Sequence, residues 1–391
     1  MKAIVAGAGI GGLTAALTLR RIGWQVEVLE RAVALAEVGA GLQISPNGHR
    51  VLAALGLADA LSAVASAPPV IEMRIGRTGR QVFSIPMGPA AVARWGAPYL
   101  QVHRADLIDL LAGALGPEAL HLGTEVTEAR TEGDQVHIET SAGPRTADLL
   151  IGADGVHSGI RTALIGTEAP SFTGSIAWRA VVPQAAVPDH PSSAGTCIWI
   201  GQGRHAVTYP VRQGRALNVV GIVARDDWRS ESWTEPGDPA DLRRDFAGWH
   251  PAIQTVLSAI DTPYCWALLD RPPLPHWSMG RVVLLGDACH PMVPSFAQGA
   301  VMAMEDAWTL ATALRHTPDV AMALAAYEAR RKPRTARVQA MARENMARFH
   351  ATGRLPRLGT FAPRPIRDLA GGLIFHRRTG WLYRHDVTRE E

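Results

Sequence analysis

The chain has 391 residues, which is long enough for two domains or for one large domain with an insertion. A hydrophobic content of 47% and a charged content of 19% are typical of a soluble globular protein. The formal net charge is +3, and this basic excess is too small and too scattered to indicate a nucleic-acid-binding protein.

The three cysteines show neither a pairing framework nor metal-ligand spacing, which suits a reducing compartment, and we expect a cytoplasmic protein. Residues 3–19 are uncharged, as in a signal peptide, but four glycines interrupt them and a nucleotide motif explains the same residues. No other long uncharged apolar stretch is present, so we expect no membrane span. The expected assembly is a monomer or a homodimer, without membrane or nucleic-acid partners.

The first thirty residues predict a strand, a glycine turn, a helix and a second strand. Residues 2–6 form a short apolar run, the length of one buried strand. Residues 13–22 show the helical spacing of apolar side chains and end at Gly23, a residue that commonly closes a helix. Residues 25–29 alternate as a second strand does, and the strand stops at Glu30.

The turn between these elements has the pattern G-x-G-x-x-G, with glycine at 7, 9 and 12. Gly7 allows a tight turn, Gly9 lets a pyrophosphate approach the backbone, and Gly12 lets the helix pack close to the strand. The free N–H groups at the start of the helix hold the phosphates. Glu30 lies close to where an acid accepts hydrogen bonds from a ribose diol. The segment predicts a dinucleotide site without distinguishing NAD, NADP and FAD; the alternative is a glycine-rich turn in an ordinary α/β domain.

The next part of the chain alternates loops, helices and strands. Residues 36–47 carry two glycines and a proline, and we expect this loop to approach a ligand. Residues 48–65 have helical spacing, and residues 70–86 resemble strands joined by turns. A further helix is expected over residues 105–115. Arg104 precedes it and can either reach phosphate and ribose oxygens or pair with Asp106 or Asp109; the residues alone favour the ion pair.

Two further strands are expected to end in an acid. Residues 125–140 predict a pair of strands joined by a turn, and the buried strand over residues 146–152 leads to Asp154. Residues 282–286 form another buried strand that leads to Asp287. In the loop that follows, a metal at His290 is rejected, because the neighbouring sequence holds no further ligands.

Two helices are expected near the C-terminal end, over residues 299–314 and 319–350, the second broken or kinked at Pro333. Its basic residues are diluted by acids, so we expect a solvated helix face and not a nucleic-acid-binding patch. They are Arg330, Arg331, Lys332, Arg334 and Arg337.

Between residues 170 and 264 the pattern changes to short alternating runs, which predict an inserted antiparallel sheet. These runs are residues 176–182, 196–200, 205–211 and 217–223. Aromatic side chains gather in or beside this region and can either wall an apolar ligand pocket or form an ordinary core. They are Trp199, Tyr209, Trp228, Trp233 and Trp266.

Three separated segments, residues 7–30, 152–155 and 281–287, together with the loop through Gly299, resemble the FAD-dependent aromatic hydroxylases. These are single-component flavoprotein monooxygenases built like p-hydroxybenzoate hydroxylase, and the resemblance covers nearly the whole chain. The segments His-Arg-Ala-Asp-Leu, from residue 103, and Trp-Leu-Tyr, from residue 381, look most like the salicylate and 3-hydroxybenzoate hydroxylase branch.

The resemblance implies an α/β fold: a discontinuous Rossmann-like FAD-binding domain, an inserted antiparallel-sheet substrate domain and C-terminal helices. The FAD-binding domain is expected in residues 1–70, 98–170 and 275–350, the substrate domain in 71–97 and 171–274, and the C-terminal helical segment in 351–391.

The resemblance also implies which residues hold FAD. The glycines would bind the pyrophosphate, Glu30 the adenosine ribose, and Arg104 the phosphate-ribitol region, which replaces the ion-pair interpretation. Asp287 would bind the ribitol chain, and a helix N-terminus would face the flavin pyrimidine edge, where its dipole stabilises the anionic reduced flavin. Val126 would touch the adenine through its backbone, and Asp154 would also help the nicotinamide cofactor. The full expected set is Gly7, Gly9, Gly12, Glu30, Arg31, Arg104, Val126, Asp154, Asp287, Gly299 and Ala300.

The implied reaction is hydroxylation of a small aromatic substrate, phenolic or hydroxybenzoate-like. NADH or NADPH would be a transient reductant, because the chain has one nucleotide motif of this kind. Oxygen would then form a flavin C4a-hydroperoxide, which the electron-rich ring attacks in a pocket that excludes water. The alternatives are a related epoxidase, a hydroxylase of a heteroaromatic or larger polycyclic substrate, an ordinary NAD-dependent dehydrogenase, and a basic nucleic-acid-binding module.

His205 and Tyr209 are the expected catalytic residues. They lie four apart on a predicted strand, so their side chains share one face. The related hydroxylases carry His and Tyr at this spacing in the pocket, which implies that His205 is a base or hydrogen-bond relay beside Tyr209. The alternative is a histidine at the sheet edge and a core tyrosine. Gln298 either lines the pocket or shapes its loop.

Two positions depart from the relatives that act on hydroxylated pyridine acids, which carry His where this chain has Gln43 and Ser295. This departure argues against a hydroxynicotinate substrate. Arg179 and Arg94 are candidates for binding a substrate carboxylate on the ground of charge alone.

Overall fold

The structure is a computed structural model that describes residues 1–35, 40–166, 170–225, 236–351 and 362–390. Its first layer is a six-stranded sheet, in which every neighbouring pair is parallel except the two strands at one edge. In spatial order the strands are β17 (Ser278–Met279), β18 (Val282–Leu284), β11 (Leu149–Gly152), β1 (Lys2–Ala6), β2 (Gln25–Glu30) and β7 (Leu120–Leu122).

The central strands of this sheet are continuous apolar runs because protein covers both of their faces. Ile4 and Val5 of β1 and Leu149, Leu150 and Ile151 of β11 are fully buried. Strand β11 pairs with β1 on one side and with β18 on the other, all in parallel. The carboxyl ends of three strands that lie far apart in the chain are therefore neighbours at one edge of the sheet.

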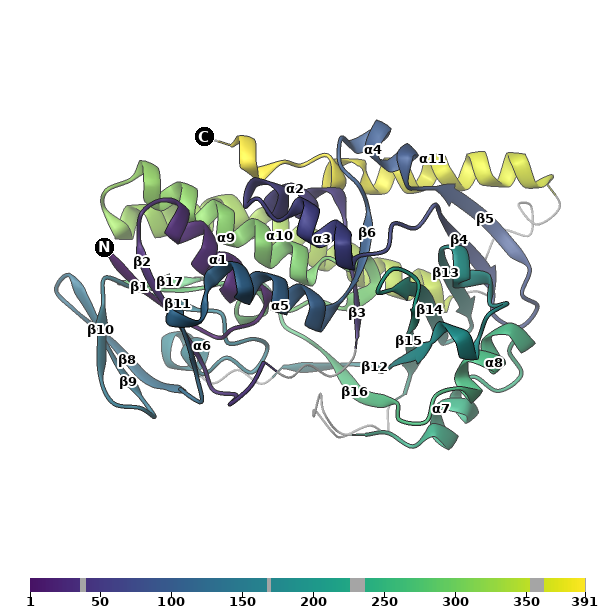
Figure 1. Ribbon diagram of the computed structural model, residues 1–391, viewed down its shortest axis with the longest axis horizontal. Helices are drawn as coiled ribbons and strands as arrows, with labels where there is room; N and C mark the ends of the chain where they lie inside the picture. The colour runs from purple at the N-terminus through teal and green to yellow at the C-terminus, as the bar shows by residue number, and fades with distance from the viewer. Residues whose placement is uncertain (36–39, 167–169, 226–235, 352–361, 391) are drawn as a thin grey trace.

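Four longer helices accompany this sheet: α1 (Ile10–Arg21), α5 (Arg104–Leu115), α9 (Gly299–His316) and α10 (Val320–His350). Helix α1 packs between α9 and α5, and α10 lies along α9 (Figure 1). Helix α10 runs through Pro333 without interruption, so the expected break is wrong there, while the alternative expectation of a kink stays a prediction. A small antiparallel sheet of β8 (Val126–Glu132), β9 (Gln135–Thr140) and β10 (Arg145–Ala147) stands beside the first sheet, which confirms the predicted strand pair.

The second large sheet has seven strands. In spatial order they are β16 (Tyr264–Asp270), β12 (Ser171–Pro183), β15 (Ala216–Ala224), β14 (Arg204–Val211), β13 (Thr196–Gly201), β4 (Val70–Ile75) and β5 (Gln81–Pro86). All four predicted strands of the inserted region are present. The sheet is not wholly antiparallel, however, since β13 pairs in parallel with β4, which comes from a much earlier part of the chain.

One face of this second sheet is covered by α7 (Pro239–Asp245) and α8 (Pro251–Ser258), on the right of Figure 1. Trp178 and Trp199 belong to the apolar core on that face, so Trp199 is a core residue. Trp266 belongs to a smaller apolar cluster with Ala177, the neighbour of Trp178 in the chain. Trp228 and Trp233 lie outside the described residues.

Between the two large sheets lies a two-stranded ribbon of β3 (Gly41–Ile44) and β6 (Leu100–His103). The helical segment expected at 48–65 is two helices, α2 (Pro46–Ala54) and α3 (Ala58–Val64), separated near Gly56, whose φ of 78° ends the first one. The remaining helices are α4 (Pro89–Trp95), α6 (Gly159–Ile165) and α11 (Arg364–Tyr383). No helix among the described residues has both the length and the apolar character needed to cross a bilayer.

Candidate active site

The glycine loop between β1 and α1 has the geometry expected of a pyrophosphate site. Gly7 has a φ of 106°, and a side chain there would collide with the carbonyl oxygen of Ala153. A Cβ at Gly12 would collide with the carbonyl oxygen of Gly7, so helix and loop are packed as closely as the motif predicts. A Cβ at Gly9 would meet nothing within 4 Å, and no side chain caps the start of α1. An anion can therefore reach the first N–H groups of this helix past Gly9.

Glu30 ends β2 and supports the same loop. Its carboxylate accepts hydrogen bonds from the backbone N–H of Ala8 (2.8 Å) and of Ala32 (2.9 Å). Each carboxylate oxygen keeps a lone pair after these bonds, which is what a ribose diol needs. Arg31 follows on the exposed surface, and Val126 begins β8, half-buried against the main core.

Acidic residues follow the other two strands at this edge. Asp154 accepts a hydrogen bond at Oδ2 from the N–H of Ile160 (3.2 Å), while its buried Oδ1 has no hydrogen-bond partner within the described part of the chain. Asp287 Oδ1 lies 3.8 Å from where a Cβ on Gly299 would stand. Solvent reaches Asp287, yet the surrounding protein desolvates it enough to raise the pKa of its carboxyl, against the attraction of His290 and Arg104.

The N-terminus of α9, formed by Gly299 and Ala300, points its first N–H groups out of the helix without a side-chain cap. Gln298, at the N-cap position, is buried instead in a polar network. Its Nε2 donates to Ser45 Oγ (2.9 Å) and its Oε1 accepts from Asn47 Nδ2 (3.3 Å). These contacts favour the expectation that Gln298 shapes the loop.

A buried charge network that was not predicted from the sequence holds α9 against α10. Arg331 donates from Nε to Asp306 Oδ1 (2.7 Å) and from Nη1 to Glu305 Oε2 (2.7 Å), and Arg334 Nε donates to Glu305 Oε2 (2.6 Å). Burial alone would raise the pKa of Glu305, but the two arginines lower it to about 2. The expectation of a solvated face is therefore wrong for Arg331, which is 2% exposed.

Potential metal-ligand atoms of Cys289, His290 and Asp306 all lie within 4.8 Å of one another. A metal at His290 was rejected because the neighbouring sequence holds no further ligands, but Asp306 comes from another segment of the chain. The donor set is nevertheless a poor one. Asp306 already accepts from Arg331 and from His290 Nε2 at 2.5 Å. Burial also raises the pKa of the Cys289 thiol, which keeps it protonated.

The two expected catalytic residues share one face of β14 but have different neighbours. His205 is buried, its Nδ1 lies 2.9 Å from His350 Nε2, and burial, followed by His350, lowers its pKa far below the ordinary value. Tyr209 is also buried, and its ring lies against Gly41, where an added Cβ would be 2.7 Å from Cε2. Burial raises the pKa of Tyr209, and the cation of Arg179 opposes that rise. Their catalytic roles remain a prediction.

The other candidate residues of the substrate site have different surroundings in the structure. Gln43 Oε1 accepts a 2.6 Å hydrogen bond from the hydroxyl of Tyr99, and Ser295 Oγ donates to the carbonyl of Ala342 (2.6 Å). Arg94 is exposed on α4, whereas Arg179 lies within the second sheet. The structure thus separates the two arginines that charge alone left equivalent.

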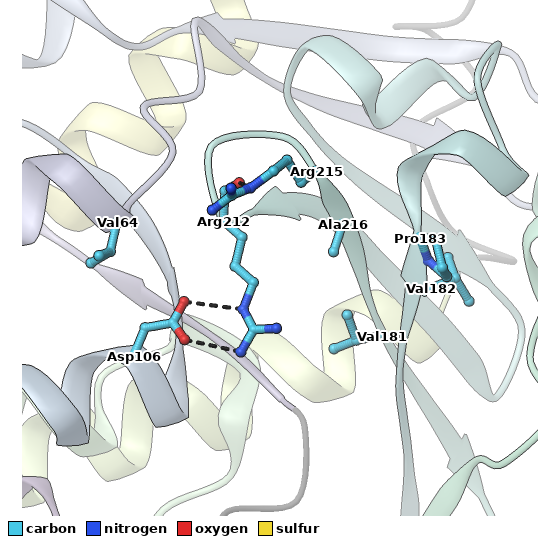
Figure 2. A pocket seen from close by; sticks show the side chains of 8 residues that line it. All are labelled: Val64, Asp106, Val181, Val182, Pro183, Arg212, Arg215 and Ala216. Atoms are coloured by element: carbon cyan, nitrogen blue, oxygen red, sulfur yellow. Dashed lines mark hydrogen bonds and ion pairs between the residues drawn. The ribbon is translucent and has the colours of Figure 1, made fainter.

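A surface pocket of about 620 Å³ lies elsewhere, where the β14–β15 turn meets α5 (Figure 2). In it Asp106, a predicted partner of Arg104 in the ion-pair interpretation, accepts two hydrogen bonds from Arg212, at 3.0 and 3.2 Å. None of the residues expected to hold FAD lines this pocket, whose lining residues are Val64, Asp106, Val181, Val182, Pro183, Arg212, Arg215 and Ala216.

Comparison with known proteins agrees with this geometry. Residues 1–342 match the family described as an FAD binding domain. The chain is 38% identical over 352 residues to the 6-hydroxynicotinate 3-monooxygenase of Bordetella bronchiseptica, covering 87% of this chain and 90% of the relative. It is 36% identical over 393 residues to the 3-hydroxybenzoate 6-hydroxylase of Klebsiella oxytoca, covering 98% and 96%.

Among solved structures, Klebsiella pneumoniae HpxO complexed with FAD and uric acid superposes with a TM-score of 0.84 at 30% identity, covering 98% of this chain and 97% of that one. The fold is thus that of an FAD-dependent oxidoreductase. The chain belongs to the family of FAD-dependent aromatic hydroxylases, which confirms the resemblance found in its sequence.

Proposed function

We propose that the protein hydroxylates a phenolic or hydroxybenzoate-like ring with electrons from NADH or NADPH. One atom of O2 enters the ring, the other leaves as water, and the reduced nicotinamide supplies two electrons. The observation that carries this proposal is the meeting of three strand ends and the uncapped N-terminus of α9 at the glycine loop. FAD bound there would supply the oxygen chemistry, and the second sheet would hold the ring.

Within this proposal the FAD contacts are those predicted from the sequence. Gly9 leaves room for the pyrophosphate, and Glu30 and Asp287 offer oxygen acceptors to the ribose and the ribitol. The N–H groups of Gly299 and Ala300 would face the flavin pyrimidine edge, where the helix dipole would favour negative charge. The raised pKa of Tyr209 keeps its hydroxyl protonated, so it can donate a hydrogen bond to a substrate phenolate.

The test is a screen of purified holoenzyme, which should be yellow. Hydroxybenzoates, phenols and heteroaromatic acids are added singly with NADH or NADPH, and both cofactor oxidation and products are measured. The proposal expects at least one ring to gain a hydroxyl group in proportion to the nicotinamide oxidised. Oxidation of nicotinamide that yields only hydrogen peroxide with every compound would contradict it.

A heteroaromatic acid is the second candidate substrate, because one similar relative is a 6-hydroxynicotinate 3-monooxygenase. The resemblance implies histidine in pyridine-acid enzymes at the position of Gln43, whose side chain here accepts a hydrogen bond from the hydroxyl of Tyr99. Product formation from 6-hydroxynicotinate but from no benzoate in the same screen would decide for this second candidate.

A further inference from the structure

Arg179 lies in the second sheet, on the strand next to the edge strand β16. It lies on β12 and pairs with Val220 of β15 and Tyr264 of β16. Side chains alternate along a strand, so Arg179 points away from the face on which Trp178 and Ala180 join the α7–α8 core. It therefore shares a side of the sheet with Ala177 and Trp266, opposite the α7–α8 core.

The guanidinium of Arg179 is held in place but has no anionic partner. Its Cζ lies 5.3 Å from the centre of the Trp266 ring, a cation–π contact that fixes the plane of the group. Its Nε is buried without a hydrogen-bond acceptor, and no carboxylate in the described part of the chain forms an ion pair with it. The charged neighbour that most affects it, apart from Tyr209, is another cation, Arg104.

Arg179 is half-buried, so water screens part of its charge, but its buried Nε lacks an acceptor and an anionic ligand would stabilise the guanidinium. Arg331, by contrast, is buried and donates hydrogen bonds to two carboxylates. With no acid paired to Arg179, an anion at this guanidinium would find a cation, and the protonated hydroxyl of Tyr209 can donate a hydrogen bond on the same face of the sheet.

The place of this anion is set by Tyr209. Val220 pairs with Arg179 on one side and with Val207 on the other, so Arg179 lies on the same face of the sheet as Tyr209, two residues beyond Val207. Tyr209 is the side chain that we expect beside the substrate ring, and the cation of Arg179 opposes the rise in its pKa. We propose that Arg179, backed by Trp266, binds the carboxylate of an aromatic acid substrate and so selects ring acids over neutral phenols. This inference rests on the proposed function, of which it names the substrate class.

The planar guanidinium suits a carboxylate because it can donate two parallel hydrogen bonds to it. These two hydrogen bonds would fix the position and the orientation of the substrate ring relative to Arg179. Binding of the acid should therefore exceed binding of the matching amide, which has the same shape without the charge, by roughly 10- to 100-fold.

The experiment compares FAD-loaded wild type with R179Q and with R94Q, the matched control on exposed α4. Flavin absorbance is titrated with 3-hydroxybenzoate and 3-hydroxybenzamide, and with 6-hydroxynicotinate and its amide. Wild type and R94Q should prefer the acid of a pair by at least about tenfold, while R179Q should lose that preference and bind the amide within about threefold of wild type.

Retention of the acid preference in R179Q would overturn the inference, as would its absence from wild type. An unchanged preference with a shifted flavin reduction potential would assign the cation to the flavin instead. If R179Q does not retain FAD, R179K is tested instead, because lysine keeps the charge without the planar guanidinium. R179K should bind the acids more weakly than wild type does, but still more tightly than it binds the matching amides. Acid-selective binding without any hydroxylated product would contradict the proposed function and leave this inference standing.

Discussion

At the scale of single residues, the three glycines of the G-x-G-x-x-G motif have different roles. Gly7 and Gly12 are required by the fold, since a Cβ at either would strike backbone oxygen. The fold does not require glycine at position 9, because a Cβ there meets no protein atom within 4 Å and any residue can adopt its φ of −72°. The sequence pattern predicts all three roles, and the structure separates the glycine needed for binding from those needed for folding.

Gly9→Val should therefore abolish FAD binding and leave the protein folded. The added side chain would occupy the approach to the first N–H groups of α1, so we expect FAD affinity to fall by at least about 100-fold, with a change in unfolding free energy within about 1 kcal/mol. Gly113→Ala is the matched control, since its Cβ also enters open space. FAD titration and urea unfolding of the apoproteins measure both quantities, and full FAD affinity in Gly9→Val would contradict the assignment of this loop.

His205 illustrates a role that sequence spacing indicates but does not decide. The spacing places it on one face with Tyr209, yet only the structure shows that its ring meets His350 and Phe349 of α10. Its strongly lowered pKa keeps it neutral at physiological pH, which suits a hydrogen-bond relay better than a base.

His205→Ala should slow product formation by about 100-fold while FAD stays bound, because a proton relay contributes on that order. Steady-state hydroxylation rates and the flavin absorbance of the purified variant are the measurements. A variant purified without FAD would show that the histidine is structural.

At the scale of elements, the strands and most helices follow from apolar periodicity, and the exceptions have physical causes. The parallel pairing of β13 with β4 joins segments more than a hundred residues apart, and local sequence carries no signal for it. Pro333 does not end α10, because tertiary packing along a long helix offsets the lost hydrogen bond. Arg331 was expected in solvent because a run of basic residues does not indicate which of its members is buried. The available signal was the pair Glu305–Asp306 in an otherwise apolar helix.

Arg331→Met should destabilise the protein strongly. It leaves two buried carboxylates without their shared partner, and such a loss costs about 3–5 kcal/mol. Arg348→Ala, on the exposed side of the same helix, removes only a surface pair with Glu344 and should cost about 0–1 kcal/mol. Urea unfolding of the three proteins makes the comparison. Equal stabilities of Arg331→Met and Arg348→Ala would contradict the account of the network.

At the scale of the whole molecule, the parallel sheet and the seven-stranded sheet lie on opposite sides of the β3–β6 ribbon (Figure 1). The ends of β1, β11 and β18 and the N-terminus of α9 lie together at one edge of the six-stranded sheet, and each comes from a different part of the chain. The sequence predicts the individual strand ends because each is an apolar run closed by an acid. The pairing of Arg179 with Trp266 could not be predicted, because it depends on which strands of the second sheet become neighbours.

A crystal structure of the holoenzyme is the most direct test of the central claim that these strand ends bind one flavin. We predict the pyrophosphate over Gly9, the ribitol beside Asp287 and the flavin pyrimidine edge at the N–H groups of Gly299 and Ala300. FAD found instead in the pocket lined by Arg212 and Arg215, or with Asp287 remote from every FAD atom, would contradict it.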